Sequence, residues 1–171
     1  MALKDCKGKY VLMCDNDTEV SDPEWLPKML GAFGRKTAIV TPVSNFAFGA
    51  QSIRYNKDFR AKGILRHNVG LVSGYFQLMR RKALDEVGGL DEDYGLGYNV
   101  DLDLSIKMTE AGYELKVIRD LFVYHHGSQS ISQVADVKKL DEDTRKLLEK
   151  KWGKDKVKKL LTKYEESFKN E

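Results

Sequence analysis

The feature that most constrains the fold is an apolar run, Tyr10–Cys14, that stops abruptly at two carboxylates, Asp15 and Asp17. Short apolar runs that contain Val and Tyr are typical of buried strands, and this one favours a strand in a parallel sheet. Open α/β sheets bind ligands at the carboxyl ends of such strands. Two carboxylates one residue apart suit Mg²⁺ or Mn²⁺ on a substrate diphosphate, although a solvated turn uses the same residues. The sequence therefore predicts an α/β fold and leaves both interpretations of the acidic loop open.

Two other kinds of acidic loop can be compared with this stretch. A calcium-binding EF-hand loop that began at Asp15 would need Gly at its sixth position and Glu at its twelfth, where the chain has Val20 and Leu26. This excludes an EF-hand. An Asp-x-Asp after an apolar strand also resembles the haloacid dehalogenase phosphatases, whose motif has Thr or Val two residues after the second Asp. Glu19 stands there instead, so a phosphatase of this kind is the weaker enzyme alternative.

The length and the composition fit one domain with a substantial core. The chain has 171 residues, of which 42% are hydrophobic and 32% charged, and its net charge is +3. No apolar run is long enough to span a bilayer and the N-terminus lacks the pattern of a signal peptide, so we expect a cytoplasmic protein. The small net charge argues against nucleic acid as a partner. The only cysteines, Cys6 and Cys14, lack the spacing of a zinc site or a disulfide framework.

The residues after the acidic loop predict helices that alternate with strands. Ser21 or Asp22 is expected to cap a helix, and residues 37–41 are expected to form a second buried strand. Together with the first strand they would make a strand-helix-strand unit. The irregular stretch 43–68 is long for a compact domain and is typical of a functional loop.

Three more strands are predicted further along the chain. Residues 71–79 predict a long strand that Gly74 interrupts, either with a bulge or with a close approach to a ligand. Residues 113–118 and 121–124 predict two further strands.

Polar groups follow or precede several of these elements. Asp101 lies in the first turn of a helix expected to run to Ala111, where the helix dipole favours a carboxylate. A simple capping role for Asp101 or Asp103 is an equal alternative. His125 and His126 come directly after the last strand, and they are either metal ligands or exposed polar residues.

Beyond residue 133 the chain becomes strongly charged. Apolar residues recur there at helical spacing from Leu140 to Phe168, with a break near Gly153. We expect residues 134–171 to be a helical appendage packed on a domain of residues 1–133. The Lys-rich outer face of these helices is expected to face solvent, with a weak contact to an anionic membrane surface as the alternative.

Taken together, several segments resemble the family 2 glycosyltransferases of the GT-A fold, over residues 6–130. The stretch from Gly8 to Leu26 resembles the metal-binding strand of that family and its next helix, and residues 41–51 resemble a following segment. Residues 73–81 and 87–92 resemble the strand and turn beneath the acceptor site. The order and spacing of these pieces are more specific than any one of them. The resemblance implies a partial GT-A domain, an α/β three-layer sandwich with a mixed sheet, followed by C-terminal helices.

The resemblance also implies an activity, a cofactor and a set of site residues. The activity is inverting, metal-dependent transfer from a nucleotide-diphospho-sugar, with a UDP-sugar expected first, to a saccharide or other hydroxyl acceptor. Asp15, Asp17 and His125 would bind Mn²⁺ or Mg²⁺ on the donor diphosphate, and Asp17 is expected as the direct ligand. Asp101 matches the Asp of the family's Glu-Asp motif and would be the catalytic base. The implied acceptor or sugar-binding residues are Gly74, Asp91 and Asp103.

Two departures from the family pattern support a rival hypothesis. Val100 stands where the family usually has the Glu of the Glu-Asp motif. The strands that recognise the nucleotide base in complete members would precede residue 1, so the sequence predicts a truncated transferase. The rival is a non-catalytic remnant that binds a glycan or a partner chain. A missing neighbour strand would also leave a sheet edge exposed, and we therefore expect self-association.

Overall fold

The computed structural model describes residues 2–53, 65–67, 69–127 and 131–166. Within this part of the chain the strands form a five-stranded sheet in the order β1-β5-β3-β6-β4 and a two-stranded sheet of β2 and β7. The strands are β1 (Tyr10–Cys14), β2 (Thr18–Glu19), β3 (Thr37–Val43), β4 (Leu65–His67), β5 (Phe76–Arg80), β6 (Glu114–Phe122) and β7 (Tyr124–His125). Residues 128–130, at the end of the stretch that resembles the transferase family, lie outside the described residues, and so does Phe168.

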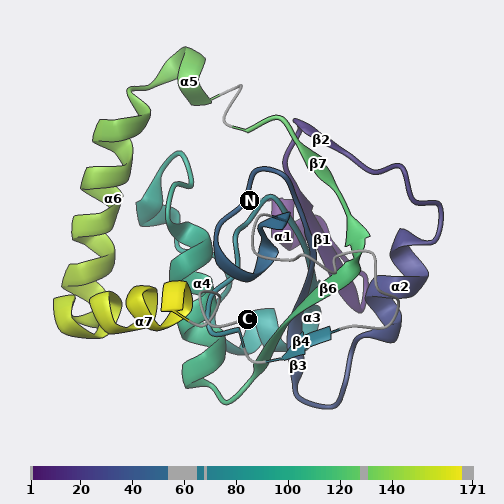
Figure 1. Cartoon of the computed structure of the whole chain (residues 1–171). Helices are drawn as coiled ribbons and strands as arrows, with labels where there is room; N and C mark the ends of the chain where they lie inside the picture. The colour runs from purple at the N-terminus through teal and green to yellow at the C-terminus, as the bar shows by residue number, and fades with distance from the viewer. Residues whose placement is uncertain (1, 54–64, 68, 128–130, 167–171) are drawn as a thin grey trace.

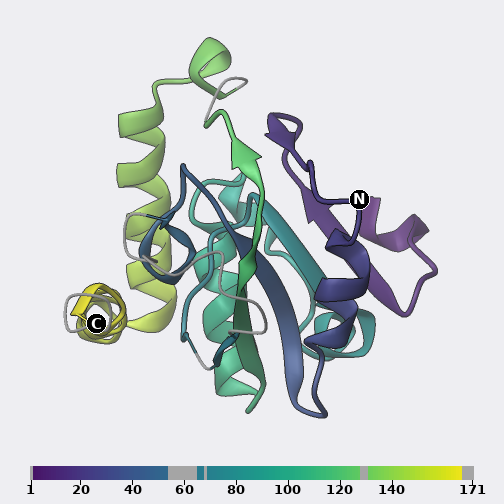
Figure 2. The same cartoon turned by 45° about the vertical axis from the view of Figure 1, so that its right-hand side comes forward.

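Helices cover both faces of the large sheet, as Figure 1 and Figure 2 show. On one side lie the longer helices α4, α6 and α7, and on the other lies α2. The α-helices are α1 (Ala2–Asp5), α2 (Trp25–Gly31), α3 (Arg81–Glu86), α4 (Val100–Glu110), α5 (Ile131–Val134), α6 (Val137–Trp152) and α7 (Lys154–Glu166), and the short 3₁₀ turns are η1 (Gly49–Gln51) and η3 (Glu92–Tyr94).

Each face of the sheet has its own apolar core. Successive side chains of a strand point to opposite faces, so Ile39 packs with residues of α3, α4, α6 and α7, whereas its neighbour Val40 packs with residues of α2. Val117 and Ile118 divide between the two cores in the same way. β3 and β6 run parallel, and the other pairings in this sheet are antiparallel. The predicted α/β three-layer sandwich with a mixed sheet is confirmed.

The position of β1 differs from the prediction of a buried strand in a parallel sheet. Among the described strands β1 pairs only with β5, and the pairing is antiparallel, from Tyr10 opposite Arg80 to Cys14 opposite Phe76. Leu12 is 38% exposed. An apolar run indicates a strand but does not indicate its neighbour, and here β5 enters between β1 and β3. The predicted strand-helix-strand unit exists, although its two strands are not adjacent.

Other elements begin or end at residues that differ from those predicted. The predicted strand 71–79 is strand only from Phe76 onward, because residues 71–75 are held mainly by side chains, as described below. Residues 113–118 and 121–124, predicted as two strands, form one long strand, β6, followed by the short β7, and the register of the parallel pairing with β3 shifts between Ile118 and Phe122. Helix α2 begins after Glu24, not after Ser21 or Asp22.

The helix that carries Asp101 agrees with its prediction. α4 runs from Val100 to Glu110, and Asp101 lies in its first turn. The N-cap residue is Asn99, in the left-handed conformation with φ of 60°. Neither Asp101 nor Asp103 is therefore the cap, and the simple capping alternative is wrong.

The C-terminal helices pack against the α/β domain through the same core as α4. Leu148 of α6 and Val157 of α7 are buried in that core, with exposed fractions of 1% and 2%. Among the described residues no helix has the length and apolar character that crossing a membrane requires.

Candidate metal and acceptor site

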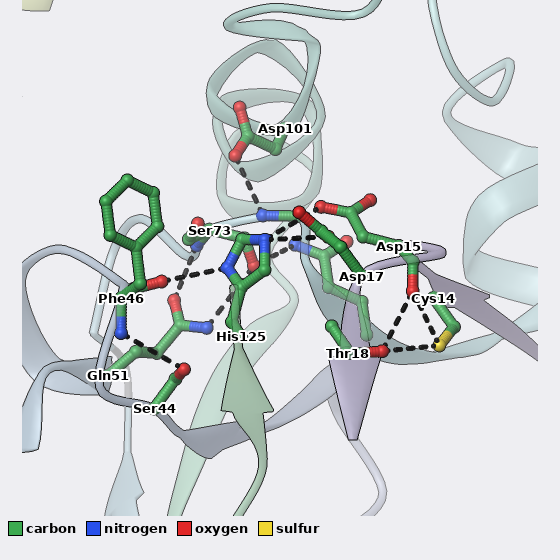
Figure 3. A network of polar contacts seen from close by, with 12 residues as sticks. Cys14, Asp15, Asp17, Thr18, Ser44, Phe46, Gln51, Ser73, Asp101 and His125 are labelled. Carbon is green, nitrogen blue, oxygen red and sulfur yellow. Dashed lines mark hydrogen bonds and ion pairs between the residues drawn. The ribbon is translucent and has the colours of Figure 1, made fainter. Parts of the chain in front are cut away.

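The acidic loop is a closed turn between β1 and β2. The backbone N–H of Asp15 donates to the carbonyl of Tyr75 at 2.9 Å and so extends the β1–β5 pairing by one residue. The Thr18 hydroxyl donates to the carbonyl of Asp15 at 2.8 Å. These two bonds fix the direction in which the chain leaves the sheet, and Asp15 and Asp17 both lie on this turn (Figure 3).

The small β2–β7 sheet brings His125 to the acidic loop. Thr18 pairs with His125 and Glu19 with Tyr124. The backbone N–H of His126 donates to the carbonyl of Asp17 at 2.9 Å. Two segments far apart in the sequence are thereby joined at one end of the large sheet, and the predicted pairing of the Asp-x-Asp loop with His125 in space is present.

The imidazole of His125 is held in one orientation. Its Nδ1 lies 2.9 Å from the carbonyl oxygen of Phe46, and since a carbonyl only accepts, Nδ1 carries the hydrogen. The ring stacks on Tyr75 with centroids 5.2 Å apart and planes at 16°. Asn45 binds the backbone of His125 on both sides, donating to its carbonyl at 3.0 Å and accepting from its N–H at 2.9 Å. Nε2 is therefore the atom presented to the acidic loop.

Three ligand atoms converge at this point (Figure 3). Nε2 of His125 lies 3.2 Å from Oδ1 of Asp17 and 3.6 Å from Oδ2 of Asp15. The three ligand atoms of these residues lie within 4.8 Å of one another. With the ring hydrogen on Nδ1, a neutral imidazole presents a lone pair towards two carboxylates, and three acceptors facing each other need a cation between them or a proton on Nε2. Carboxylate oxygens with one imidazole suit Mn²⁺ or Mg²⁺, so the residues fit the metal that the sequence predicted.

The orientation of His125 by a carbonyl is typical of metal-binding histidines. Such residues usually donate their other ring N–H to a carbonyl or carboxylate, which fixes the tautomer. The Phe46 carbonyl provides this contact here, and sequence reasoning missed it because a backbone oxygen leaves no signal in the sequence. Burial raises the pKa of Asp15, as does the charge of Asp17, while His125 opposes the rise. A bound cation would relieve this repulsion.

Asp101 lies above the acidic loop, at the start of α4 (Figure 3). Its Oδ2 accepts from the backbone N–H of Gly74 at 2.8 Å and its Oδ1 from that of Leu102 at 2.9 Å. Burial raises the pKa of Asp101 to about 6, and the nearby charge of Asp15 adds to the rise, whereas the backbone hydrogen bonds oppose it. A carboxyl group with a pKa near neutral is suited to proton transfer.

Gly74 makes a close approach, and the neighbour is Asp101. A Cβ at residue 74 would lie 3.2 Å from the Cβ of Asp101 and 3.3 Å from the Cε of Met13. The absence of a side chain thus lets the residue 72–74 segment pass directly under the carboxylate. Gly74 lies before β5, which begins at Phe76, so it interrupts no strand, and its close neighbour is the protein's own Asp101; a close approach to a ligand stays a prediction.

A buried glutamine holds this segment in place. The side chain of Gln51 is fully buried, and its Oε1 accepts from the backbone N–H of Ser73. Its Nε2 donates to the Thr41 hydroxyl at 2.7 Å and to the Ser73 carbonyl at 3.3 Å. Sequence reasoning placed Gln51 in a segment resembling the family but gave it no role. The signal was available, since a Gln in an apolar, glycine-flanked stretch needs partners if it is buried.

The remaining predicted residues do not join this cluster. Asp103 is fully buried, and its carboxylate contacts Lys107, Lys151 and Trp152. Asp91 forms an ion pair with Lys151, which lowers the pKa of the Asp91 carboxyl group. His126 faces away and pairs with Glu19 at 2.7 Å, so the two histidines of the pair have different surroundings.

The fold is similar to that of part of a glycosyltransferase of the GT-A type. The mannosyltransferase PcManGT from Pyrobaculum calidifontis, solved in complex with GDP-Man and Mn²⁺, matches this structure with a TM-score of 0.55. The sequence identity is 16%, and the match covers 75% of this chain and 35% of that chain. At this level of identity the likeness shows the fold.

The sequence comparison is more specific. The family model described as glycosyl transferase family 2 matches residues 1–88, which include the acidic loop and Gly74. The chain belongs to the family 2 glycosyltransferases, and the resemblance found in the sequence is confirmed. It is also 27% identical to the uncharacterized protein y4gI of Sinorhizobium fredii (strain NBRC 101917 / NGR234) over an alignment of 150 residues. The match covers 75% of this chain, which spans only 16% of that relative.

Proposed function

We propose that this chain carries the donor-diphosphate site and the acceptor-activating carboxylate of an inverting glycosyltransferase that uses a nucleotide-diphospho-sugar. The observation that carries the proposal is the convergence of His125 Nε2 with the carboxylates of Asp15 and Asp17, at 3.6 and 3.2 Å, next to the partly buried carboxylate of Asp101. Membership of family 2 supports the general reaction.

Each residue has a role that follows from its surroundings. Asp15, Asp17 and His125 would hold Mn²⁺ or Mg²⁺, which when bound neutralises the charge that develops on the leaving diphosphate. Asp101 accepts the proton of the acceptor hydroxyl while that oxygen bonds to the sugar carbon and the bond from this carbon to the diphosphate breaks. Attack from the face opposite the leaving group inverts the configuration. The N–H groups of Gly74 and Leu102 hold the Asp101 carboxylate for this step.

For the donor we propose only a chemical class, a nucleotide-diphospho-sugar. The mannosyltransferase with the similar fold was solved with GDP-Man and Mn²⁺, which supports a nucleotide-sugar donor and Mn²⁺ for this chain. The sequence led us to expect a UDP-sugar first, so both bases belong in the test. A saccharide or other hydroxyl acceptor is proposed from the family alone. Acceptor roles for Gly74, Asp91 and Asp103 stay predictions. A cytoplasmic location, with or without a peripheral contact to the membrane, also stays a prediction.

Calorimetric titration of UDP, GDP and the corresponding sugar nucleotides, with and without Mn²⁺, tests the donor site. We expect binding to the wild-type chain that depends on Mn²⁺ and is lost in Asp17→Asn. Asp143→Asn, an exposed carboxylate on α6, is the matched control and should bind as the wild type does. Absence of nucleotide binding under every condition would count against a working donor site in this chain.

The rival function is a non-catalytic GT-A domain that binds a glycan or a partner chain through the same cleft. The observation that favours it is Val100, which replaces an acidic residue next to Asp101. Metal-dependent donor hydrolysis or transfer, lost in Asp101→Asn, would exclude the rival. The haloacid dehalogenase alternative loses its basis, since the family match covers the Asp-x-Asp loop on which it rested.

A further inference from the structure

The start of α4 is bound to α6 on both sides of Asp101. On the N-terminal side, the Asn99 side chain donates to Oδ1 of Asp141 at 2.7 Å and to the Thr144 hydroxyl at 3.0 Å. On the C-terminal side, Trp152 Nε1 donates to Oδ1 of Asp103 at 2.7 Å. Asp101 lies midway between these two anchors, two residues from each.

Lys151 strengthens the second anchor with charge. Its ammonium group lies 2.9 and 3.0 Å from the two carboxylate oxygens of Asp103 and also pairs with Asp91, just before η3. Lys107 of α4 approaches Asp103 at 3.1 Å. Because the Asp103 carboxylate is fully buried, it needs these partners, and loss of one leaves an incompletely paired buried charge.

On its opposite side the same turn of α4 contacts the residue 72–74 segment. Ser105 donates to the carbonyl of Asp101 at 2.8 Å and accepts from the N–H of Val72 at 3.1 Å. Gly74 donates to Asp101 itself, and its missing Cβ would lie 3.2 Å from that residue. The turn therefore lies between α6 on one side and a tightly packed backbone on the other, and a shift away from α6 has little room.

We propose that α6 is a positioning element for Asp101, in which Asn99 and Asp103 are the anchors on α4 and Asp141, Thr144, Lys151 and Trp152 are their partners. This deepens the proposed function and rests on it where it gives Asp101 the role of base. The C-terminal helix is then part of the acceptor site, not an appendage to it. A catalytic base must be held within a fraction of an ångström, and loops alone hold such groups poorly.

Hydrogen exchange of the Gly74 amide reports the position of Asp101 directly. This amide donates to Oδ2 of Asp101, so release of α4 from α6 should expose it, whereas the amide of Val40 in the central strand β3 reports global unfolding. We expect Lys151→Met combined with Asn99→Gly to speed exchange at Gly74 by about tenfold more than at Val40, whose exchange rises only by the loss of global stability. Gly is chosen at residue 99 because it accepts the positive φ of this position.

Two further variants make the test specific. Lys150→Met removes the same charge from an exposed neighbour on α6 and should leave Gly74 as in the wild type, and Lys151→Arg should restore protection. If the double variant does not fold, Trp152→Phe removes the indole N–H that donates to Asp103, retains an aromatic side chain, and receives the same measurement. Unchanged exchange at Gly74, or equal acceleration at Gly74 and Val40, would overturn the proposal. Nucleotide titration of the same variants is interpreted separately, because its failure in the wild-type chain would count against the donor site and not against the α6 contact.

Discussion

Gly127 shows at the level of one residue how closely the chain packs beside the proposed metal site. Its φ is +79°, and a Cβ there would lie 2.6 to 2.8 Å from three ring atoms of Phe46, whose carbonyl orients His125. Gly112 has nearly the same φ, +80°, with no atom within 4 Å of the corresponding position. Substitutions at these two glycines therefore separate the energetic cost of the left-handed backbone conformation from the cost of the contact with Phe46.

We expect Gly112→Ala to lower the free energy of unfolding by about 1 kcal/mol, from the left-handed conformation alone. Gly127→Ala should lower it by up to about 1 kcal/mol more, because the Phe46 ring, which is 53% exposed, must also leave its present rotamer. Mn²⁺ affinity should fall in Gly127→Ala and stay unchanged in Gly112→Ala. Chemical denaturation and metal titration of the two variants measure both effects, and equal results for the two would show that Phe46 yields without cost.

The partly buried carboxyl group of Asp101 gives a prediction for how stability depends on pH. Its pKa is raised from the ordinary value of 3.8 to about 6, so the folded protein holds this proton more tightly than the unfolded chain does. Stability from this group is therefore present at low pH and lost as the pH rises through about 6. Between about pH 4.5 and pH 7.5 the free energy of unfolding of the wild type should fall by about 2 kcal/mol relative to that of Asp101→Asn. Denaturation at both pH values, with EDTA present, measures the difference, and a pH-independent difference would contradict the raised pKa.

At the scale of whole elements, β1 presents an unpaired edge within the described part of the chain. It pairs only with β5, and Leu12 on this strand is 38% exposed. Exposed strand edges add further strands, so the expected self-association would use this edge. Leu12→Lys should abolish it, since a charged residue on an edge opposes pairing.

Sedimentation at increasing concentration measures this association. Leu30 of α2 has the same exposed fraction, 38%, but lies on a helix, so Leu30→Lys is the matched control and should associate as the wild type does. A wild-type chain that sediments as a monomer throughout, or a Leu30→Lys variant that behaves like Leu12→Lys, would contradict the assignment to β1.

The elements also show what the sequence can and cannot predict. Periodicity and end signals predicted α4, because its apolar face and its acidic first turn are local properties. They did not predict that β5 lies between β1 and β3, since strand order depends on contacts distant in the sequence. They placed residues 71–75 in a strand, whereas Gln51 and Asp101 hold that segment through single side-chain contacts that no local pattern records.

At the scale of the whole molecule, the predicted ligand set depends on segments from both ends of the α/β domain. Asp15 and Asp17 were identifiable from their spacing, but His125 was separated from its exposed neighbour His126 only by the resemblance to a family. The structure supplies the reason in the β2–β7 pairing, which turns one ring to the acidic loop and the other to Glu19. The site thus joins the turn after the edge strand β1 to β7, the short strand that follows β6.

Because the ligands come from both of these segments, metal binding should stabilise the entire fold. A ligand that binds only the folded state adds stability by mass action, about 2.7 kcal/mol at a hundredfold excess over its dissociation constant. For a chain of this size we expect Mn²⁺ to raise the melting temperature by about 5–10 °C under such conditions. Asp17→Asn and His125→Gln should remove this increase, while Asp143→Asn should keep it. Thermal unfolding followed by circular dichroism, with Mn²⁺ or with EDTA, makes the comparison. An equal increase in Asp17→Asn and in the wild type would place the stabilising ion elsewhere on the molecule.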